Sequence, residues 1–86
     1  MFYVYIIKSE LNGSLYIGYS TNVQNRLDQH NSGSSEYTKH RGPWRLVYYE
    51  AFSSEKDART RELALKDFGR AYGQLKRRLA QSLEDT

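Results

Sequence analysis

The sequence contains no cysteine, so neither a disulfide nor a zinc site built on thiolates can stabilise the fold. No stretch approaches the roughly 18 apolar residues that indicate a membrane-spanning helix. The first ten residues, MFYVYIIKSE, have no basic region before their short apolar run, unlike a secretory signal peptide. Internal repeats and low-complexity segments are also absent. We therefore expect a cytoplasmic protein.

The chain is short, which limits its organisation. Eighty-six residues are enough for one domain, and residues 1–86 are expected to form a single one. A chain of this size buries roughly 60% of the surface that it exposes when unfolded. A small hydrophobic core without cross-links is therefore feasible.

Positive charge is concentrated in two segments, although the formal net charge is only +3. Residues 39–45 include three lysines or arginines and no acidic residue, and residues 56–78 include eight basic and three acidic residues. Basic clusters separated by aromatic-rich sequence indicate a polyanionic partner such as a nucleic acid. Solvated helix faces are the alternative explanation for a net charge this small.

Six segments have the composition or periodicity of regular secondary structure. Three are rich in β-branched and aromatic residues, as strands are, and three have the apolar spacing or capping residues of helices. The order β-β-α-β-α-α predicts an α/β protein of the α+β type, with a small three-stranded antiparallel sheet flanked by helices. The expected strands are residues 2–8, 14–20 and 44–52, and the expected helices are about 22–32, from Ser53 or Ser54 to Phe68, and about 70–83.

The first two strands are expected to form a hairpin. The Asn12-Gly13 pair is typical of a two-residue turn, but that turn would separate Tyr5 from Tyr16 by about 13 Å along the sheet. A four-residue loop, 9–12, would instead place the two tyrosines directly opposite each other. Both registers put the two rings on the same face, and we expect the second.

Side-chain spacing predicts which residues share a face. Alternation in the third strand puts Trp44, Leu46 and Tyr48 on one side of the sheet. Arg26 and His30 are four residues apart, so they form one stripe on the first helix. That stripe borders the apolar side of the helix, which indicates that a guanidinium and an imidazole face the strands.

Capping residues predict where the helices begin and end. Ser20 or Thr21 is expected to cap the first helix, and Gly33 suits the left-handed position after it. Gly69 is expected to end the second helix. In the third helix the residues that face the core are expected to be Tyr72, Leu75, Leu79 and Leu83.

Four polar residues near the predicted hairpin are candidates for chemistry. A tyrosine in a strand is usually a packing residue, and a free phenol with a pKa of about 10 is a weak base. Arg26 has the side chain that holds a phosphate through two parallel N–H bonds, although a helix arginine is usually solvated. His30 is either a helix-end residue, or a proton carrier or partner that orients a tyrosine hydroxyl. The two tyrosines in question are Tyr5 and Tyr16.

Glu62 is the least expected residue of the second helix. It shares a helix face with Ala58 and Leu65, so a carboxylate borders apolar surface. The ordinary explanation is an ion pair with Lys66, four residues later. The alternative is a metal ligand, because Mg²⁺ needs few protein carboxylates when it keeps waters and binds substrate phosphate.

Short motifs occur here in a characteristic order. The tripeptide YVY (3–5) is followed after ten residues by YIG (16–18), then by Arg26 and His30, and finally by Glu62 in the segment ARTRELALK. Each motif is weak alone, but the ordered set resembles the GIY-YIG nuclease superfamily. It is most similar to the small, free-standing, single-domain bacterial members of UPF0213 type.

The resemblance implies metal-dependent hydrolysis of nucleic-acid phosphodiesters. Tyr5 matches the tyrosine that is the favoured general base toward water, and Tyr16 matches the tyrosine that supports it through hydrogen bonding. Arg26 matches the arginine that holds the scissile phosphate, and His30 matches a frequent helix histidine near the base. Glu62 matches the glutamate that binds one Mg²⁺ or Mn²⁺ ion, which is the implied cofactor.

The resemblance covers nearly all of residues 2–78 and has two departures. Tyr3 stands where the first motif of the family has glycine, and no asparagine follows Asn31, where larger relatives have one. No DNA-reading module is appended, so we expect low sequence selectivity and strong salt dependence. The residues expected to contact nucleic acid are Tyr37, Thr38, Lys39, His40, Arg41, Lys66, Lys76 and Arg77.

The leading hypothesis is an endonuclease acting on DNA rather than RNA, in repair or DNA processing, with no membrane and no obligate protein partner. Single-stranded or branched DNA would suit a basic groove with exposed aromatic residues. The alternative is a nucleic-acid-binding module with weak or no catalysis. A third hypothesis, a protein-interaction domain, depends only on the basic face of the last helix. The aromatic residues considered for strand contact are Tyr19, Tyr37 and Trp44.

Overall fold

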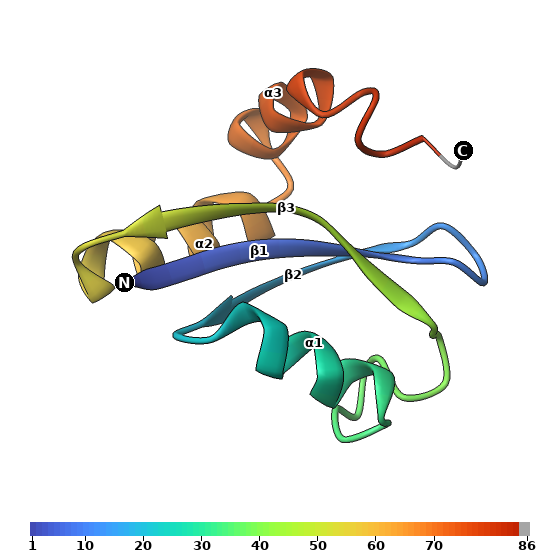
Figure 1. Ribbon diagram of the computed structural model, residues 1–86. Helices are drawn as coiled ribbons and strands as arrows, with labels where there is room; N and C mark the ends of the chain where they lie inside the picture. Colours follow the sequence, from blue (N-terminus) through green and yellow to red (C-terminus); the bar gives the residue numbers. More distant parts are fainter. Residues whose placement is uncertain (85–86) are drawn as a thin grey trace.

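The computed structural model describes residues 1–84 and has a three-stranded antiparallel sheet with helices on both faces (Figure 1). The strand order β2-β1-β3 places the first strand between the other two. Helix α1 lies against one face, and α2 and α3 lie over the other. The predicted α+β class and element order are confirmed. The elements are β1 (Phe2–Ser9), β2 (Leu15–Ser20), α1 (Val23–Asn31), β3 (Trp44–Phe52), α2 (Glu55–Lys66) and α3 (Arg70–Arg78).

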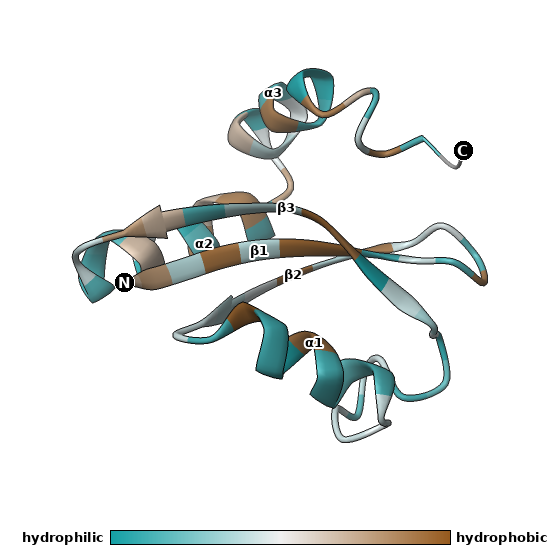
Figure 2. Ribbon diagram, viewed as in Figure 1, coloured by the Kyte–Doolittle hydropathy of each residue, from teal (hydrophilic) through white to brown (hydrophobic). Residues whose placement is uncertain are grey.

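The central strand is buried on both faces because its side chains alternate between two hydrophobic clusters. Val4 and Ile6 belong to the large core, which α2 and α3 cover. Tyr5 and Ile7 belong to the small core, which α1 covers. In Figure 2 hydrophobic residues accordingly run along β1. The other buried members of the large core are Ile17, Ala58, Leu65, Leu75 and Leu79, and Trp44 completes the small core.

The β1–β2 hairpin has a register two residues away from the predicted one. Tyr5 lies opposite Gly18, not opposite Tyr16. The loop does contain four residues, 10–13, because the Ser9 amide donates to the Ser14 carbonyl across it. The prediction placed this loop one residue too early and so left out Gly13, whose φ of 78° belongs inside the turn. Both phenols still share a face, since a two-residue shift preserves side-chain direction.

Strand β3 contains a bulge that changes the faces of its second half. Leu46 pairs with Ile7 and Tyr48 pairs with Ile6, so Val47 is an extra residue between them. Leu46 therefore packs in the small core and Tyr48 against the large core. The prediction that these two residues share a face is wrong, because strict alternation fails at a bulge.

Helix α1 is capped by a residue that the sequence did not single out. Asn22, rather than Ser20 or Thr21, accepts the amide hydrogen bond of Asn25 at 3.0 Å. The left-handed conformation of Gly33, with φ of 85°, is as predicted. Helix α1 is thus held at both ends, which fixes the direction of its inward stripe.

The later helices differ from the prediction at their C-terminal ends. Ser54 caps α2 as one of the two predicted candidates. The left-handed position that follows α2 belongs to Phe68, with φ of 56°, and not to Gly69. Helix α3 ends before Leu83, although Leu83 still packs against the large core as predicted.

Candidate functional site

The Tyr5 ring lies directly over Gly18 of the edge strand. A Cβ atom at Gly18 would be only 2.3 Å from both Cζ and Oη of Tyr5, so no larger residue fits without displacing the ring. A glycine inside a strand often marks such a close approach. Because Gly18 has no side chain, the Tyr5 ring can cross β2 at this position.

Three buried side chains form a hydrogen-bonded chain that starts at Tyr5. Its hydroxyl lies 2.8 Å from Nε2 of His30, and Nδ1 of His30 lies 2.8 Å from Oγ1 of Thr38. The Thr38 hydroxyl in turn donates to the Ser35 carbonyl at 3.5 Å. A hydroxyl that donates there accepts from Nδ1–H, which leaves Nε2 to accept the Tyr5 proton. The network thus assigns the tautomer of His30.

Electrostatic neighbours show which groups act on Tyr5 and His30. Burial raises the pKa of Tyr5 to about 12, and the nearby Tyr16 adds to the rise, whereas the charge and hydrogen bonding of Arg26 oppose it. Burial lowers the pKa of His30 to about 4, and the positive charge of Arg26 acts in the same direction. At neutral pH the resting pair is therefore a neutral phenol donating to a neutral imidazole.

Tyr16 contacts this chain through its ring. It lies edge-on to His30, with ring centroids 4.9 Å apart, and beside Tyr37 at 5.5 Å. The hydroxyl of Tyr5 is bonded to His30 rather than to Tyr16. In this structure Tyr16 contacts His30 through its ring, and its support of Tyr5 through hydrogen bonding stays a prediction.

Arg26 extends from α1 toward the two phenols and remains half-buried. Its NH1 group donates to Oε1 of Gln29 at 2.8 Å. A guanidinium has five donors, so the remaining N–H groups can meet a phosphate. Its effect on the pKa values of Tyr5 and His30 places its charge beside them.

Glu62 is buried on α2 and held by two cations. Lys66 Nζ lies 2.9 Å from Oε2, and Arg59 NH1 lies 3.5 Å from Oε1. The pair with Lys66 confirms the ordinary interpretation of the spacing. The carboxylate nevertheless lies close enough to Tyr5 for its charge to raise the pKa of that phenol. Glu62 is therefore a buried, paired carboxylate whose charge is felt at Tyr5.

The few oxygen donors near Glu62 limit which metal ions could bind there. Among residues 1–84 no three His, Cys, Asp or Glu side chains gather into a metal site. One buried carboxylate fits a Mg²⁺ or Mn²⁺ ion that keeps most of its waters and shares a substrate phosphate. The carboxylate already pairs with the positive charges of Lys66 and Arg59, so a divalent ion that displaced them would find a compatible oxygen donor there, and the residues present fit the group.

The loop between α1 and β3 is fixed by several hydrogen bonds. The Asn31 side chain accepts from the Trp44 amide at 2.7 Å and donates to the Trp44 carbonyl at 3.0 Å. The Trp44 indole donates to the Thr38 carbonyl at 3.0 Å. Because Thr38 is completely buried, it lies beneath His30 and has no surface for the nucleic-acid contact expected of it. Trp44, only 3% exposed, is likewise unable to stack on a strand.

The other predicted contacts of this loop are exposed. Tyr37 is 50% exposed, and the Arg41 guanidinium lies over its ring at 4.4 Å while donating to its carbonyl. Lys39 is paired with Glu36 at 2.7 Å. These exposed residues, together with His40, form a basic and aromatic surface next to Tyr16.

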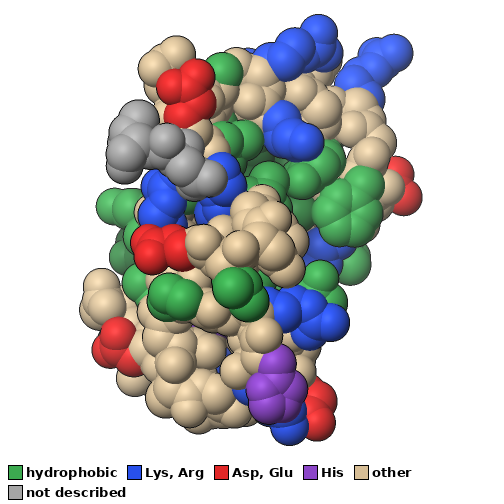
Figure 3. All heavy atoms as spheres, turned by 90° about the vertical axis from the view of Figure 1, so that its right-hand side faces the viewer, with side chains coloured by type: hydrophobic (Ala, Val, Ile, Leu, Met, Phe, Trp, Pro, Cys, Tyr) green, Lys and Arg blue, Asp and Glu red, His purple; other side chains and the backbone are tan. Residues whose placement is uncertain are grey.

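Basic residues also gather over α3. Figure 3 shows lysine and arginine side chains at the upper end of one face, at the height of α3 in Figure 1. Lys76 and Arg77 are exposed, and Lys76 lies 5.4 Å from the centre of the Tyr72 ring. Tyr19, by contrast, is half-buried under the Arg59 guanidinium at 3.6 Å, which leaves it less suited to strand contact than predicted.

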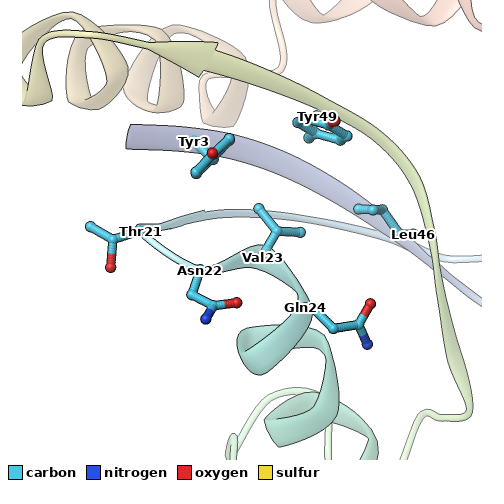
Figure 4. A pocket seen from close by; sticks show the side chains of 7 residues that line it. All are labelled: Tyr3, Thr21, Asn22, Val23, Gln24, Leu46 and Tyr49. Atoms are coloured by element: carbon cyan, nitrogen blue, oxygen red, sulfur yellow. The ribbon is translucent and has the colours of Figure 1, made fainter. Parts of the chain in front are cut away.

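Two surface grooves flank the sheet. The edge groove has a volume of about 390 Å³ and lies beside β2, with Tyr16 in its lining. A second groove of about 360 Å³ lies between the start of α1 and strands β1 and β3 (Figure 4). None of the five predicted catalytic and metal-binding residues lines the second groove. Its lining is Tyr3, Thr21, Asn22, Val23, Gln24, Leu46 and Tyr49.

Comparison with known families agrees with the order of motifs and the geometry. The GIY-YIG catalytic domain matches residues 1–81 of this chain. The chain belongs to the GIY-YIG family. This is a family of nuclease domains, which implies nucleic-acid binding and, in general, dependence on a divalent metal. Among the residues that the structure describes, no helix has the length and apolar content needed to cross a membrane.

Individual relatives carry names that state no activity. A UPF0213 protein of Staphylococcus haemolyticus is 52% identical over 69 residues, which cover 79% of this chain and 83% of that protein. A UPF0213 protein of Clostridium perfringens is 42% identical over 71 residues, covering 81% and 75%. The solution NMR structure of a UPF0213 protein from Bacillus halodurans is similar with a TM-score of 0.56 and 40% identity, covering 92% of this chain and 85% of that one.

Three residues have positions or roles that the sequence does not predict. Gly18 makes room for the Tyr5 ring, and the available signal is that a glycine inside a strand often marks a close approach. Thr38 is predicted to contact nucleic acid but is buried, because no local pattern indicates that a loop threonine lies beneath a helix histidine. Phe68 gave no signal at all, since a phenylalanine is not expected at positive φ.

Proposed function

We propose that this protein is a metal-dependent endonuclease that hydrolyses DNA phosphodiesters with little sequence selectivity, on single-stranded or branched DNA. The observation that supports it most is the buried Tyr5–His30 hydrogen bond with a half-buried arginine and a buried glutamate both acting on the same phenol. These side chains come from three elements, β1, α1 and α2. A tyrosine that served only to pack the core would not need a guanidinium and a carboxylate near it, so these charged groups favour a functional role.

The Tyr5–His30 pair would act as a proton acceptor toward water. The Tyr5 oxygen takes a proton from the attacking water while its own proton moves to Nε2 of His30. The water oxygen forms a bond to phosphorus as the bond to the departing oxygen breaks, and that oxygen then takes a proton from solvent. Nδ1–H of His30 stays bonded to Thr38 throughout, which keeps the imidazole in place.

In the absence of substrate the proton stays on Tyr5. Burial raises the pKa of Tyr5 to about 12 and lowers the pKa of His30 to about 4, and this large difference disfavours transfer of the Tyr5 proton to His30 in the free protein. Positive charge near Tyr5 and negative charge near Arg26 both reduce this difference. The proton should therefore move only when substrate and metal are bound, which limits unproductive ionisation.

The remaining residues position the phosphate. Arg26 would donate parallel N–H bonds to the phosphoryl oxygens and stabilise the charge that builds on them. Glu62 would hold the Mg²⁺ or Mn²⁺ ion after release from Lys66 and Arg59. When bound, the ion supplies charge stabilisation for the departing oxygen and lowers the pKa of nearby hydroxyl groups.

The first experiment compares cleavage and binding of a labelled single-stranded oligonucleotide by the wild type and Glu62→Gln, with Mg²⁺, with Mn²⁺ and with EDTA. We expect the wild type to cleave only with metal, and Glu62→Gln to lose at least 100-fold in rate while its binding in EDTA persists. Binding without cleavage by the wild type on single-stranded, duplex and branched DNA and on RNA would instead identify a binding module.

The second experiment tests the arginine. Arg26→Lys keeps the charge but loses the planar fork, so the single-turnover rate should fall about 100-fold with little change in thermal stability. Gln29→Ala is the matched control, because it removes the observed partner of Arg26 without removing the guanidinium. A wild-type rate for Arg26→Lys would contradict bidentate phosphate binding.

A further inference from the structure

The edge groove has the walls of an aromatic stacking site. It is open along β2, which is an edge strand, and it is bounded by the loop before β3 on one side and the end of α2 on the other. Its one charged lining residue is Lys66, and the other residues are apolar or aromatic. The lining consists of Leu15, Tyr16, Ile17, Tyr37, Lys66 and Phe68.

Phe68 is held in this wall at an energetic cost. Its φ of 56° is in the left-handed region, where a bulky residue is disfavoured by about 1–2 kcal/mol. Gly69, the next residue, is the type that adopts this conformation freely. The ring is nevertheless 64% exposed, so burial offsets only part of this cost. Strained backbone that presents an exposed side chain is typical of a binding site.

Two residues of the groove contact members of the candidate active site. Tyr16 lines the groove and also contacts His30. Lys66 lines the groove and is bonded to Glu62. A group bound in the groove is therefore next to both halves of the candidate active site.

We propose that the edge groove binds one unpaired nucleobase of the substrate, adjacent to the phosphodiester that is cleaved; this assignment depends on the proposed function. Aromatic walls stack on the face of any base, and a single ammonium at the wall suits a ligand whose neighbour is a phosphate. A base within a duplex has both faces covered by its neighbours and cannot enter. The groove therefore selects a base that is single-stranded or displaced from the stack.

The rigid partners of the two exposed rings support this assignment. Tyr37 is held by Arg41 and packs beside Tyr16, and Phe68 packs edge-on against Tyr72 at 5.0 Å. Rings that are already oriented lose little conformational entropy when a base stacks on them. An apolar peptide lacks the phosphate that would reach Arg26, so a nucleotide fits the combined surface better.

The test measures binding in EDTA, so that it does not depend on cleavage. One fluorescent single-stranded DNA carries all its bases, and a second of the same length and charge carries abasic residues at every position. The wild type should bind the first about 5- to 100-fold more tightly than the second, as expected for stacking of one base. Phe68→Ala should lose most of this preference and bind the abasic strand as the wild type does.

Two further variants make the result specific. Tyr49→Ala is the matched control, because Tyr49 is also an exposed aromatic residue (54%) but lines the second groove (Figure 4). The Tyr49→Ala protein should prefer the strand with bases as strongly as the wild type does. Phe68→Gly removes the same ring while relieving the positive φ, so it should be at least as stable as the wild type and still lose the preference. An unchanged preference in both Phe68 variants would overturn the proposal.

Two duplex substrates, one with a single bulged base and one perfectly paired, show which kind of unpaired base the groove accepts. Tight binding to a duplex with one bulged base would support a displaced base, whereas tight binding to the single strand alone would support a continuous unpaired strand. Equal binding to a perfect duplex, or to the abasic strand, would overturn the base site. A protein that shows the base preference but never cleaves would overturn the proposed nuclease and leave the groove assignment standing.

Discussion

Gly18 determines where the phenol of Tyr5 can lie. Replacing it with alanine puts a methyl group 2.3 Å from the Tyr5 hydroxyl, so the ring must move. We expect Gly18→Ala to lose about 1–3 kcal/mol of stability through overpacking. Cleavage should fall about 100-fold, because a displacement of about 1 Å at a reacting group has an effect of that size. Urea unfolding and single-turnover cleavage measure the two effects.

Gly73 offers a control for the same substitution. It lies within α3, and a Cβ atom there would meet nothing within 4 Å. Gly73→Ala should therefore stabilise the protein by about 0.5–1 kcal/mol through its helix propensity and leave cleavage unchanged. Normal cleavage by Gly18→Ala would mean that the position of the Tyr5 ring is not needed for activity.

His30 should make the protein less stable in acid. Its pKa is about 4 in the folded protein against 6.5 for a free histidine, so between these values the unfolded chain binds a proton that the folded chain excludes. The stability that depends on neutral His30 is complete above pH 6.5 and declines as the pH falls toward 4, by at most roughly 3 kcal/mol. The polar groups around the ring are Arg26 from α1, the phenols of Tyr5 and Tyr16, and the Thr38 hydroxyl from the loop before β3.

The measurement compares wild type with His30→Gln by urea unfolding at pH 7 and pH 4.5. Glutamine can still accept the Tyr5 hydrogen bond but does not titrate. The wild type should lose more stability than the variant over this range, although carboxylates contribute equally to both. Parallel losses would show that His30 is protonated as easily in the folded protein as in the unfolded chain.

At the scale of elements, one ion pair fastens α2 to the sheet. Arg61 donates from Nε and NH2 to the carboxylate of Glu50 on β3, at 2.8–3.1 Å, and Tyr48 donates to the same carboxylate at 2.6 Å. Burial alone would raise the pKa of Glu50, but the hydrogen bonds from Arg61 and Tyr48 outweigh it and lower the pKa. Because Arg61 precedes Glu62 in the helix, this contact also positions the candidate metal ligand.

Removing one partner should therefore affect both stability and activity. We expect Glu50→Ala to cost about 1–3 kcal/mol, since it leaves the partly buried guanidinium unpaired. The double variant Glu50→Ala/Arg61→Ala should be more stable than the sum of the two single losses predicts, because the unpaired charge is gone. Thermal and urea unfolding of all four proteins give the coupling, and strict additivity would show that the pair does not fasten α2.

At the scale of the whole molecule, the basic surface of α3 is separate from the phenols. If it follows the nucleic-acid backbone, replacing Lys76, Arg77 and Arg78 with alanine should weaken binding and flatten its salt dependence, by about 0.7 in slope for each lost contact with single-stranded DNA. The rate with bound substrate should change little. Binding is measured by fluorescence anisotropy at several salt concentrations.

Lys56 provides the comparison for this surface. It is exposed in the first turn of α2, so Lys56→Ala removes a charge from outside the α3 cluster. Its salt slope should equal that of the wild type. An unchanged slope in the α3 variant as well would mean that the helix does not face the backbone of the nucleic acid.

The basic loop and the basic helix lie on different parts of the molecule, with the edge groove near the first of them. Tyr37 lines the groove and carries Arg41 over its ring, whereas Lys76 and Arg77 belong to α3. A strand that enters at the groove could thus have its base, its scissile phosphate and its flanking backbone contacted by separate elements. Low sequence selectivity is expected from such contacts, since none of them reads a base edge.

The sequence by itself determined the order and type of all six elements, the antiparallel sheet and the family. These features depend on local properties: strand composition, the spacing of Arg26 and His30 on one helix, and the order of short motifs along the chain. The common face of Tyr5 and Tyr16 was also predictable, because it survives any shift by an even number of residues.

Only the tertiary structure decided how the candidate site is connected. The placement of Thr38 beneath His30 and the bulge at Val47 depend on which residues meet across elements, and no local spacing records that. The strained Phe68 is the clearest case, since local preference favours Gly69 for the left-handed position. Packing contacts between elements outweigh preferences of about 1 kcal/mol, which is why these positions could be known only from the folded chain.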